Sequence, residues 1–159
     1  MLNGGGAAMT ALDTFVGTHQ KSVDAKGRVS VPPTFRTILS REGFEGHFAR
    51  THKRDATLEC GTQSWITQMS PAQEALDPDS EEYQDLLLLR IGLSEPLTWD
   101  PEGRVTLPKK FLEHTGITNA AVFVGLKTHF QIWEPAALAQ RLAEARARET
   151  VRAAKGKAS

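Results

Sequence analysis

The chain has 159 residues, 40% of them hydrophobic, and its 19 Lys and Arg balance 19 Asp and Glu. This length suits one domain or two small units that share a core, and it can bury roughly 70% of the unfolded surface without disulfides or a metal. The single cysteine, Cys60, excludes a disulfide framework within the chain and suits a reducing cytoplasm. Apolar runs such as Leu86–Leu89 are far shorter than the ~20 residues that cross a bilayer, so no membrane partner is expected.

The zero net charge conceals an uneven distribution of charged residues. Residues 15–54 carry eight Lys or Arg against three Asp or Glu, whereas residues 55–103 carry eleven acids and one base, Arg90. A basic region can bind a polyanion even in a chain that is neutral overall. The first part of the chain is therefore the candidate for contact with nucleic acid.

The beginning of the chain is interpreted as a flexible leader over residues 1–14. It lacks a basic segment followed by a sustained apolar run, so it is not typical of a signal peptide, and Met9 is an alternative start. A first repeat is expected over residues 15–65. It opens with β-forming residues at 15–23, which predict a strand.

The stretch "DAKGRVSVP" at 24–32 predicts a turn and a second strand. Asp24 suits the first turn position because its carboxylate accepts backbone N–H groups two residues on, and Gly27 tolerates the positive φ of the fourth position. Val29 and Val31 then share one face of the strand and Arg28 lies on the other. A helix is predicted from Pro33 to about Gly43, and strands near 46–50 and 56–60 complete the repeat.

Residues 66–94 are predicted to form a helical linker. Ser70 with Gln73 matches a capping box at a helix start, and Asp79 with Glu82 is a second candidate. The helix that follows the second box is expected to stop at Gly92.

A second repeat is expected over residues 95–134, because "DPEGRVTLP" at 100–108 restates the first motif 76 residues later. Asp100 and Gly103 take the turn positions of the first copy. A short helix to Gly116 and two further strands follow. The last segment, 135–159, is predicted to be a helix with a basic tail whose final turns fray.

Neither repeat is large enough to bury a core alone, so the two are expected to pair about a pseudo-twofold axis. The predicted fold class is mostly β with short helices (α+β), forming a small barrel or sandwich with helices at its edge.

Three cations gather near the first turn: Arg28 directly after it, Lys26 at its tip and Lys21 on the preceding strand. β-Ribbons can enter the major groove of DNA, and arginine grips a phosphate or guanine edge bidentately. The alternative is that Arg28 only pairs with Asp24. That alternative is stronger for Arg104, whose turn contains Glu102, so the two copies are predicted to bind DNA unequally.

No other pattern in the sequence points to a reaction. The five histidines lack metal-ligand spacing, and Cys60 has no evident base partner. The chain is therefore predicted not to be an enzyme and to need no metal or other cofactor.

The paired motifs, with "FVG" opening the first copy and "VFVG" and "FQIW" closing the second, resemble the MraZ family of bacterial transcriptional regulators over roughly residues 15–133. The resemblance implies two AbrB/SpoVT-like swapped-hairpin units that form a β-barrel, and protomers that close into a ring. It also implies binding to short G-rich direct repeats of double-stranded DNA upstream of the division and cell-wall gene cluster, including the protein's own gene, usually as a repressor. In the family the arginine of the first motif, here Arg28, is linked to DNA binding.

A regulator of this kind would be cytoplasmic and nucleoid-associated. The leader and the acidic stretch at 77–85 depart from the family pattern. The remaining alternative is an AbrB-like antitoxin or adaptor, in which the β-unit dimerises and the C-terminal helix binds a protein partner.

Overall fold

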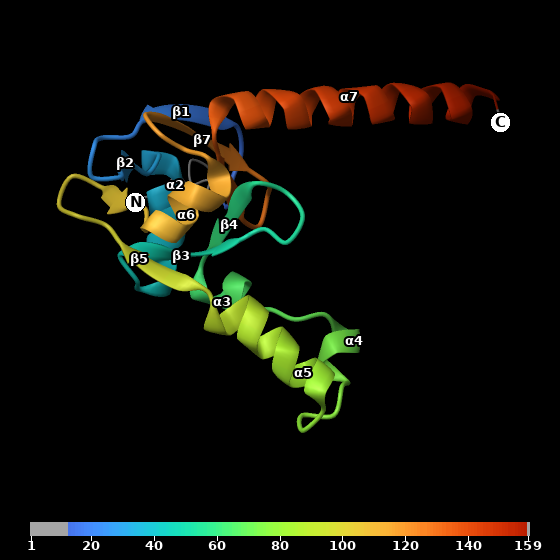
Figure 1. The fold of residues 1–159 in the computed structure, drawn as a ribbon, viewed down its shortest axis with the longest axis horizontal. Coiled ribbons are helices and arrows are strands. Elements are labelled where there is room, and N and C mark those ends of the chain that lie inside the picture. Colours follow the sequence, from blue (N-terminus) through green and yellow to red (C-terminus); the bar gives the residue numbers. More distant parts are fainter. Residues whose placement is uncertain (1–12, 159) are drawn as a thin grey trace, which may run out of the picture.

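The computed structural model describes residues 13–158, and its centre is an antiparallel sheet of six strands with a separate two-stranded ribbon (Figure 1). The sheet has the order β1-β7-β8-β4-β3-β5 and the ribbon pairs β2 with β6. The strands are β1 (Thr18–Ser22), β2 (Arg28–Ser30), β3 (Gly46–Thr51), β4 (Thr57–Gly61), β5 (Glu95–Thr98), β6 (Arg104–Thr106), β7 (Ala120–Gly125) and β8 (Phe130–Trp133). The predicted class, mostly strand with short helices, is confirmed.

The strand order is symmetric about its middle. The second-repeat strands β5, β7 and β8 occupy the places that mirror β1, β3 and β4 of the first repeat. The outer strand β1 pairs with β7 of the other copy, while β5 pairs with β3. Each repeat therefore completes its sheet with a strand from its partner, which explains why neither copy needs a core of its own.

The ribbon shows the same pseudo-twofold relation residue by residue. Val29 pairs with Val105, its own counterpart in the second repeat. Arg28 pairs with Thr106 and Ser30 pairs with Arg104, so the two strands exchange equivalent positions. The axis consequently passes between the two valines, both of which are buried.

The core joins both repeats into one cluster. The equivalent residues Phe35 and Phe111 are both buried, and Phe35 lies 5.1 Å from Phe130 of the other copy, ring centre to ring centre. Both phenylalanines sit on short helices, α2 (Pro33–Leu39) and α6 (Lys109–Thr115). Each helix begins at or next to a proline and is followed by a left-handed glycine, Gly43 beyond a 3-10 turn after α2 and Gly116 directly after α6.

The copies differ in length after these helices. The 3-10 turn, Ser40–Glu42, separates α2 from its terminal glycine, whereas α6 reaches Gly116 directly. The 3-10 turn therefore holds some of the extra residues of the first copy.

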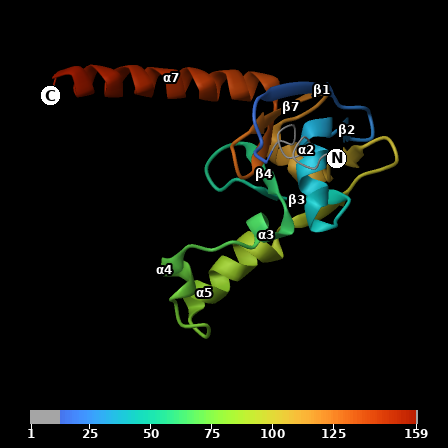
Figure 2. The same ribbon diagram turned by 180° about the vertical axis from the view of Figure 1, so that it is seen from behind.

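The linker forms short helices that extend from the sheet body, namely α3 (Gln63–Ile66), α4 (Pro71–Glu74), α5 (Glu81–Leu86) and a π-helix, η2 (Leu87–Gly92) (Figure 2). The capping box of Ser70 and Gln73 is confirmed, although it starts a helix of only four residues. The second box is wrong: Ser80 is the N-cap of α5 and its side chain accepts the N–H of Tyr83. A serine hydroxyl reaches this N–H because Ser80 stands directly before the helix, one residue beyond Asp79.

The last helix, α7 (Pro135–Ala158), projects from the sheet as a single rod in both views (Figures 1 and 2). Leu138 and Leu142 pack with Val122 and Trp133 at its base, as their spacing predicts. The fraying expected at its end is not seen, because the helix is continuous to residue 158. No helix among residues 13–158 has the length and hydropathy to cross a membrane.

The leader predicted over residues 1–14 falls mostly on residues 1–12, which lie outside the described part. The domain boundaries drawn from the sequence stay predictions.

Candidate nucleic-acid interface

The first motif folds as a tight turn between β1 and β2. The N–H of Gly27 donates to the carbonyl of Asp24 at 2.9 Å. The Asp24 carboxylate accepts the N–H groups of Lys26 and Arg28 at 3.0 and 2.9 Å. Gly27 has a φ of 81°, and a Cβ there would also lie 3.2 Å from the carbonyl oxygen of Leu107. Both the conformation and the space favour glycine.

The second motif repeats this backbone almost unchanged. Gly103 donates to the Asp100 carbonyl at 2.9 Å and has a φ of 79°. The carboxylate of Asp100 accepts the N–H groups of Glu102 and Arg104, both at 2.9 Å. Local hydrogen bonds therefore fix the two loops in the same form.

Each turn aspartate also forms an ion pair with the arginine that follows. The Nε–Oδ2 distance is 2.6 Å for Arg28 and Asp24, and 2.8 Å for Arg104 and Asp100. The backbone N–H of the arginine, more than its side chain, holds the pKa of each carboxyl below its ordinary value. The ion pair between Arg28 and Asp24, which the sequence offered as an alternative to DNA contact, is thus present, and it uses the Nε atom of Arg28.

The turns differ at their third residue. Glu102 pairs with Nη2 of Arg104 at 2.6 Å, so two carboxylates hold that guanidinium. The hydrogen bond that the Arg104 side chain donates to Asp100 is the main cause that raises the pKa of Arg104. Lys26 occupies the matching position in the first turn and is exposed. Within residues 13–158, the terminal amines of Arg28 have no ion pair.

The ribbon brings both arginines to one face. The four outward residues, opposite the buried valines, are Arg28, Ser30, Arg104 and Thr106. Lys21 lies elsewhere. It is on β1, where it pairs with Ala121 of β7, and strand alternation puts its side chain on the same side as that of Val23. Because Val23 pairs with Val29 in an isolated bridge, Lys21 is on the side away from Arg28.

Comparison with known proteins identifies the relatives of this chain. Residues 95–157 match the family model described as "MraZ protein, putative antitoxin-like". A protein of Xanthobacter autotrophicus named "Transcriptional regulator MraZ" is 40% identical over 84% of this chain and 85% of its own length. Proteins of the same name from Gluconacetobacter diazotrophicus and Rickettsia canadensis are 38% and 37% identical, over 86% and 78% of this chain and 89% and 83% of their own lengths. The chain belongs to the MraZ family.

Sequence reasoning missed one cation of this MraZ-family surface. Arg36 on α2 donates to the Val31 carbonyl at 3.2 Å, and its guanidinium lies so close to Gly103 that a Cβ there would be 2.6 Å away. The counterpart of Arg36 is Leu112 on α6, whose side chain would lie 3.4 Å from a Cβ added at Gly27. The sequence did mark position 36 as different, since the equivalent residue of the second repeat, Leu112, is apolar. Only the pairing of strands between the repeats shows that Arg36 contacts the turn of the second motif.

The surface offers polar donors and no metal ligands. Residues 13–158 contain no group of three or more His, Cys, Asp or Glu placed to hold a metal ion. Arginine and lysine donors on a narrow two-stranded ribbon can contact phosphates and the acceptor edges of bases.

Proposed function

We propose that the chain is a transcriptional regulator that binds double-stranded DNA chiefly through its first turn. The observation that carries this proposal is the difference between the motif arginines. Arg28 has one carboxylate partner and an exposed lysine beside it, whereas Arg104 has two carboxylate partners. Charge available to a phosphate or base is therefore greater at the first turn.

The ion pair with Asp24 fits a recognition role. Through Nε it fixes the plane of the Arg28 guanidinium before DNA arrives, so less side-chain entropy is lost on binding. The two terminal amines can then donate to O6 and N7 of a guanine. Lys26 at the tip supplies a phosphate contact.

The proposed target is short G-rich direct repeats upstream of the division and cell-wall genes, including the protein's own gene, and the proposed effect is repression in the cytoplasm at the nucleoid. One protomer presents few cations, so a single contact should be weak and sensitive to salt. A ring of protomers presents identical turns in one rotational sense, which suits direct repeats. Avidity between neighbouring turns can raise affinity by about 10²–10⁴.

The test is a set of duplexes with one, two or three boxes from the DNA upstream of the gene. Two further duplexes have one box inverted or five base pairs inserted between boxes. We expect tight binding only with two or more boxes in one orientation and at helical-turn spacing, measured by electrophoretic shift. Equal affinity for one and several boxes, or a preference for the inverted box, would rule the mechanism out.

A second candidate is an antitoxin-like or adaptor role. It is favoured by α7, which stands clear of the sheet beyond its base and is exposed along most of its last part. A small toxin gene beside this gene, together with a toxin that binds α7 in a pull-down, would favour this role over regulation of cell-wall genes.

A further inference from the structure

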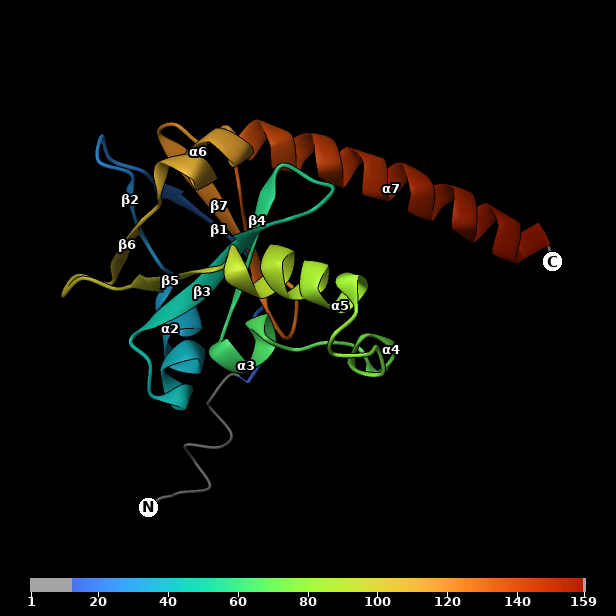
Figure 3. The same ribbon diagram turned by 60° about the horizontal axis from the view of Figure 1, so that its bottom comes forward.

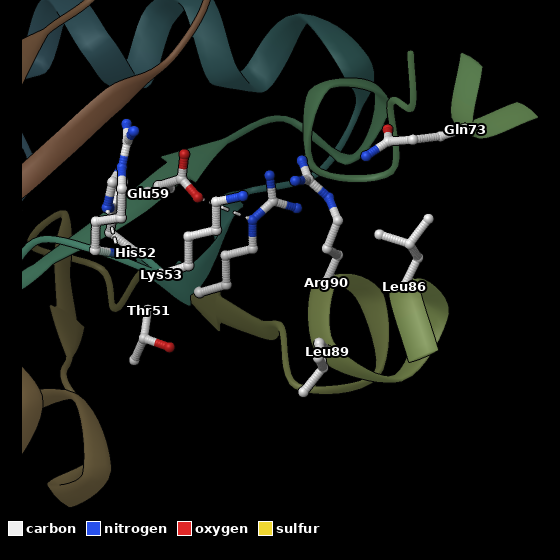
Figure 4. A pocket seen from close by; sticks show the side chains of 10 residues that line it. Thr51, His52, Lys53, Glu59, Gln73, Leu86, Leu89 and Arg90 are labelled. Carbon is white, nitrogen blue, oxygen red and sulfur yellow. Dashed lines mark hydrogen bonds and ion pairs between the residues drawn. The ribbon is translucent and has the colours of Figure 1, made fainter. Parts of the chain in front are cut away.

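A basic cleft of about 440 Å³ lies between the β3–β4 hairpin and the linker helices (Figure 4). Its charged and titratable lining residues are Arg50, His52, Lys53, Arg54, Glu59 and Arg90. The motif turns project from one end of the molecule and the linker helices extend from another (Figures 1 and 3). The cleft is therefore separate from the proposed DNA-binding ribbon.

Arg50 forms the fixed wall of this cleft. Its side chain is only 4% exposed, and its Nη1 donates to the carbonyl of Ile66 at 2.8 Å. Its Nε pairs with Glu59 at 3.2 Å, and the guanidinium lies 5.1 Å from the ring centre of Trp65. Trp65 in turn stacks on His129 at 4.2 Å. Because these contacts fix the Arg50 guanidinium, its positive charge is in position before a ligand binds.

Arg90 is the unexplained member of the cleft. It is the only base among the eleven acids of residues 55–103, yet in residues 13–158 it forms no ion pair with any of them. It faces Arg50 instead: burial first, and then the charge of Arg90, lower the pKa of Arg50. In Figure 4 the side chain of Lys53 extends toward the carboxylate of Glu59, and the side chain of Arg90 extends from the linker helix into the same cleft.

Positive side chains that lie close together, with fewer carboxylates than cations nearby, repel one another and favour an anion between them. Four permanent cations, Arg50, Lys53, Arg54 and Arg90, line the cleft against the single carboxylate of Glu59. The excess of three positive charges matches two linked phosphate groups, which carry about three negative charges at neutral pH.

The far side of the cleft is apolar. Leu86 and Leu89 line it, and Leu89 is 65% exposed. Exposed leucines next to arginines suit a ligand that has both an apolar organic group, which contacts the leucines, and negatively charged groups, which contact the arginines. The volume of about 440 Å³ also exceeds what a lone phosphate would fill.

We propose that this cleft binds a small organic diphosphate of the nucleoside diphosphate class. The phosphates lie between Arg50, Arg90 and Lys53, and the organic group rests on Leu86 and Leu89. The lining residues come from the linker between the repeats and from the β3–β4 hairpin. A bound diphosphate would therefore hold η2 against β3 and β4.

The test is calorimetric titration of the full chain with ADP, GDP, pyrophosphate and inorganic phosphate, near 0.1 M salt. We expect saturable binding of the diphosphates and much weaker binding of inorganic phosphate. Arg90→Gln should weaken ADP binding by about tenfold or more, because charge-assisted hydrogen bonds are lost. The matched control is Arg152→Gln on α7, which removes the same charge far from the cleft and should change binding by less than about twofold.

Several outcomes would overturn the proposal. One is the absence of binding heat with every diphosphate at millimolar concentration, and another is an equal loss in Arg90→Gln and Arg152→Gln. A third is displacement of ADP by a short DNA duplex whose own binding Arg90→Gln weakens to the same extent, since the cleft would then serve the DNA backbone. If Arg90→Gln does not fold by circular dichroism, Lys53→Gln on the exposed hairpin replaces it, with the same expected loss.

Discussion

The two motif turns share a backbone and differ in charge. Both close through the same hydrogen bond, which the glycine N–H donates to the aspartate carbonyl. Both use a left-handed glycine, and both pair the aspartate with the following arginine. The first turn has Lys26 at its third position, whereas the second has Glu102, which takes up a second edge of the Arg104 guanidinium.

This difference separates the roles of the motif. The Asp-x-x-Gly-Arg pattern is sufficient to build a turn and to aim an arginine, and it does so twice. A single side chain at the tip then decides how much positive charge is left for a ligand. Under the proposed function, one copy therefore keeps the recognition surface while the other mainly completes the barrel-like fold.

The largest effect should come from removing the motif arginines one at a time. Arg28→Ala should lose most specific DNA binding, because each missing bidentate contact costs about 1–3 kcal/mol per protomer, or about 5- to 150-fold. Arg104→Ala should weaken binding far less, since two carboxylates already hold that side chain. Fluorescence anisotropy on a two-box duplex measures both. Equal losses would show that the copies contribute alike.

A second contrast concerns His47 of the first repeat and Ala121, the residue at the equivalent position of the second repeat. On their strands, His47 pairs with Leu97 of β5 and Ala121 pairs with Lys21 of β1. His47 is fully buried, its Nε2 has no partner within residues 13–158, and burial lowers its pKa to about 4.

The buried His47 should accordingly make the fold sensitive to acid. The unfolded chain takes up the proton first, so stability is complete above about pH 6.5 and falls as the pH drops toward 4, by about 3 kcal/mol from this group. His47→Leu should lack that part of the decline. Urea denaturation at pH 7 and pH 4.5 measures the free energy of unfolding, and parallel pH slopes for the two proteins would contradict the assignment.

Exchanging the tip residues should make the turns alike. Glu102→Lys removes one partner of Arg104 and adds a cation, so DNA affinity should rise by about two- to tenfold and the salt slope should steepen by up to about one. Lys26→Glu is the matched reverse change and should weaken binding. If neither substitution alters the salt dependence, the tips do not face DNA.

The smallest effect is expected from the turn aspartates, where the copies should behave alike. Asp24→Asn and Asp100→Asn keep an oxygen for the backbone N–H groups and lose the partly exposed ion pair, so each should lower Tm by roughly 1–3 °C. Both pKa values are lowered in the folded chain, so this stabilisation is present above about pH 3.8 and is lost as the pH falls further. Thermal denaturation of both variants at pH 7 and pH 3 measures this effect. A much larger fall in Tm for one variant than for the other would show that the two turns are not equivalent.

Local features of this protein could be predicted from the sequence because local bonds create them. The spacing of Asp24 and Gly27 determines a turn, the alternation of Val29 and Val31 determines a buried strand face, and Pro33 begins a helix. The repetition of the motif further required two similar units that share a core. At the linker the same reasoning erred by one residue, taking Asp79 for Ser80, because adjacent capping residues compete and the rest of the chain selects one.

Tertiary structure alone decided which segments meet. Each repeat has several β-forming segments, and only packing of the whole chain pairs β1 with β7 and aligns Val29 with Val105. The same exchange places Arg36 against the opposite turn, and the fold of the linker carries Arg90 to Arg50 across an acidic stretch. These contacts join residues far apart in the sequence, where burial of apolar surface and long-range charge set the geometry and local propensity has no influence.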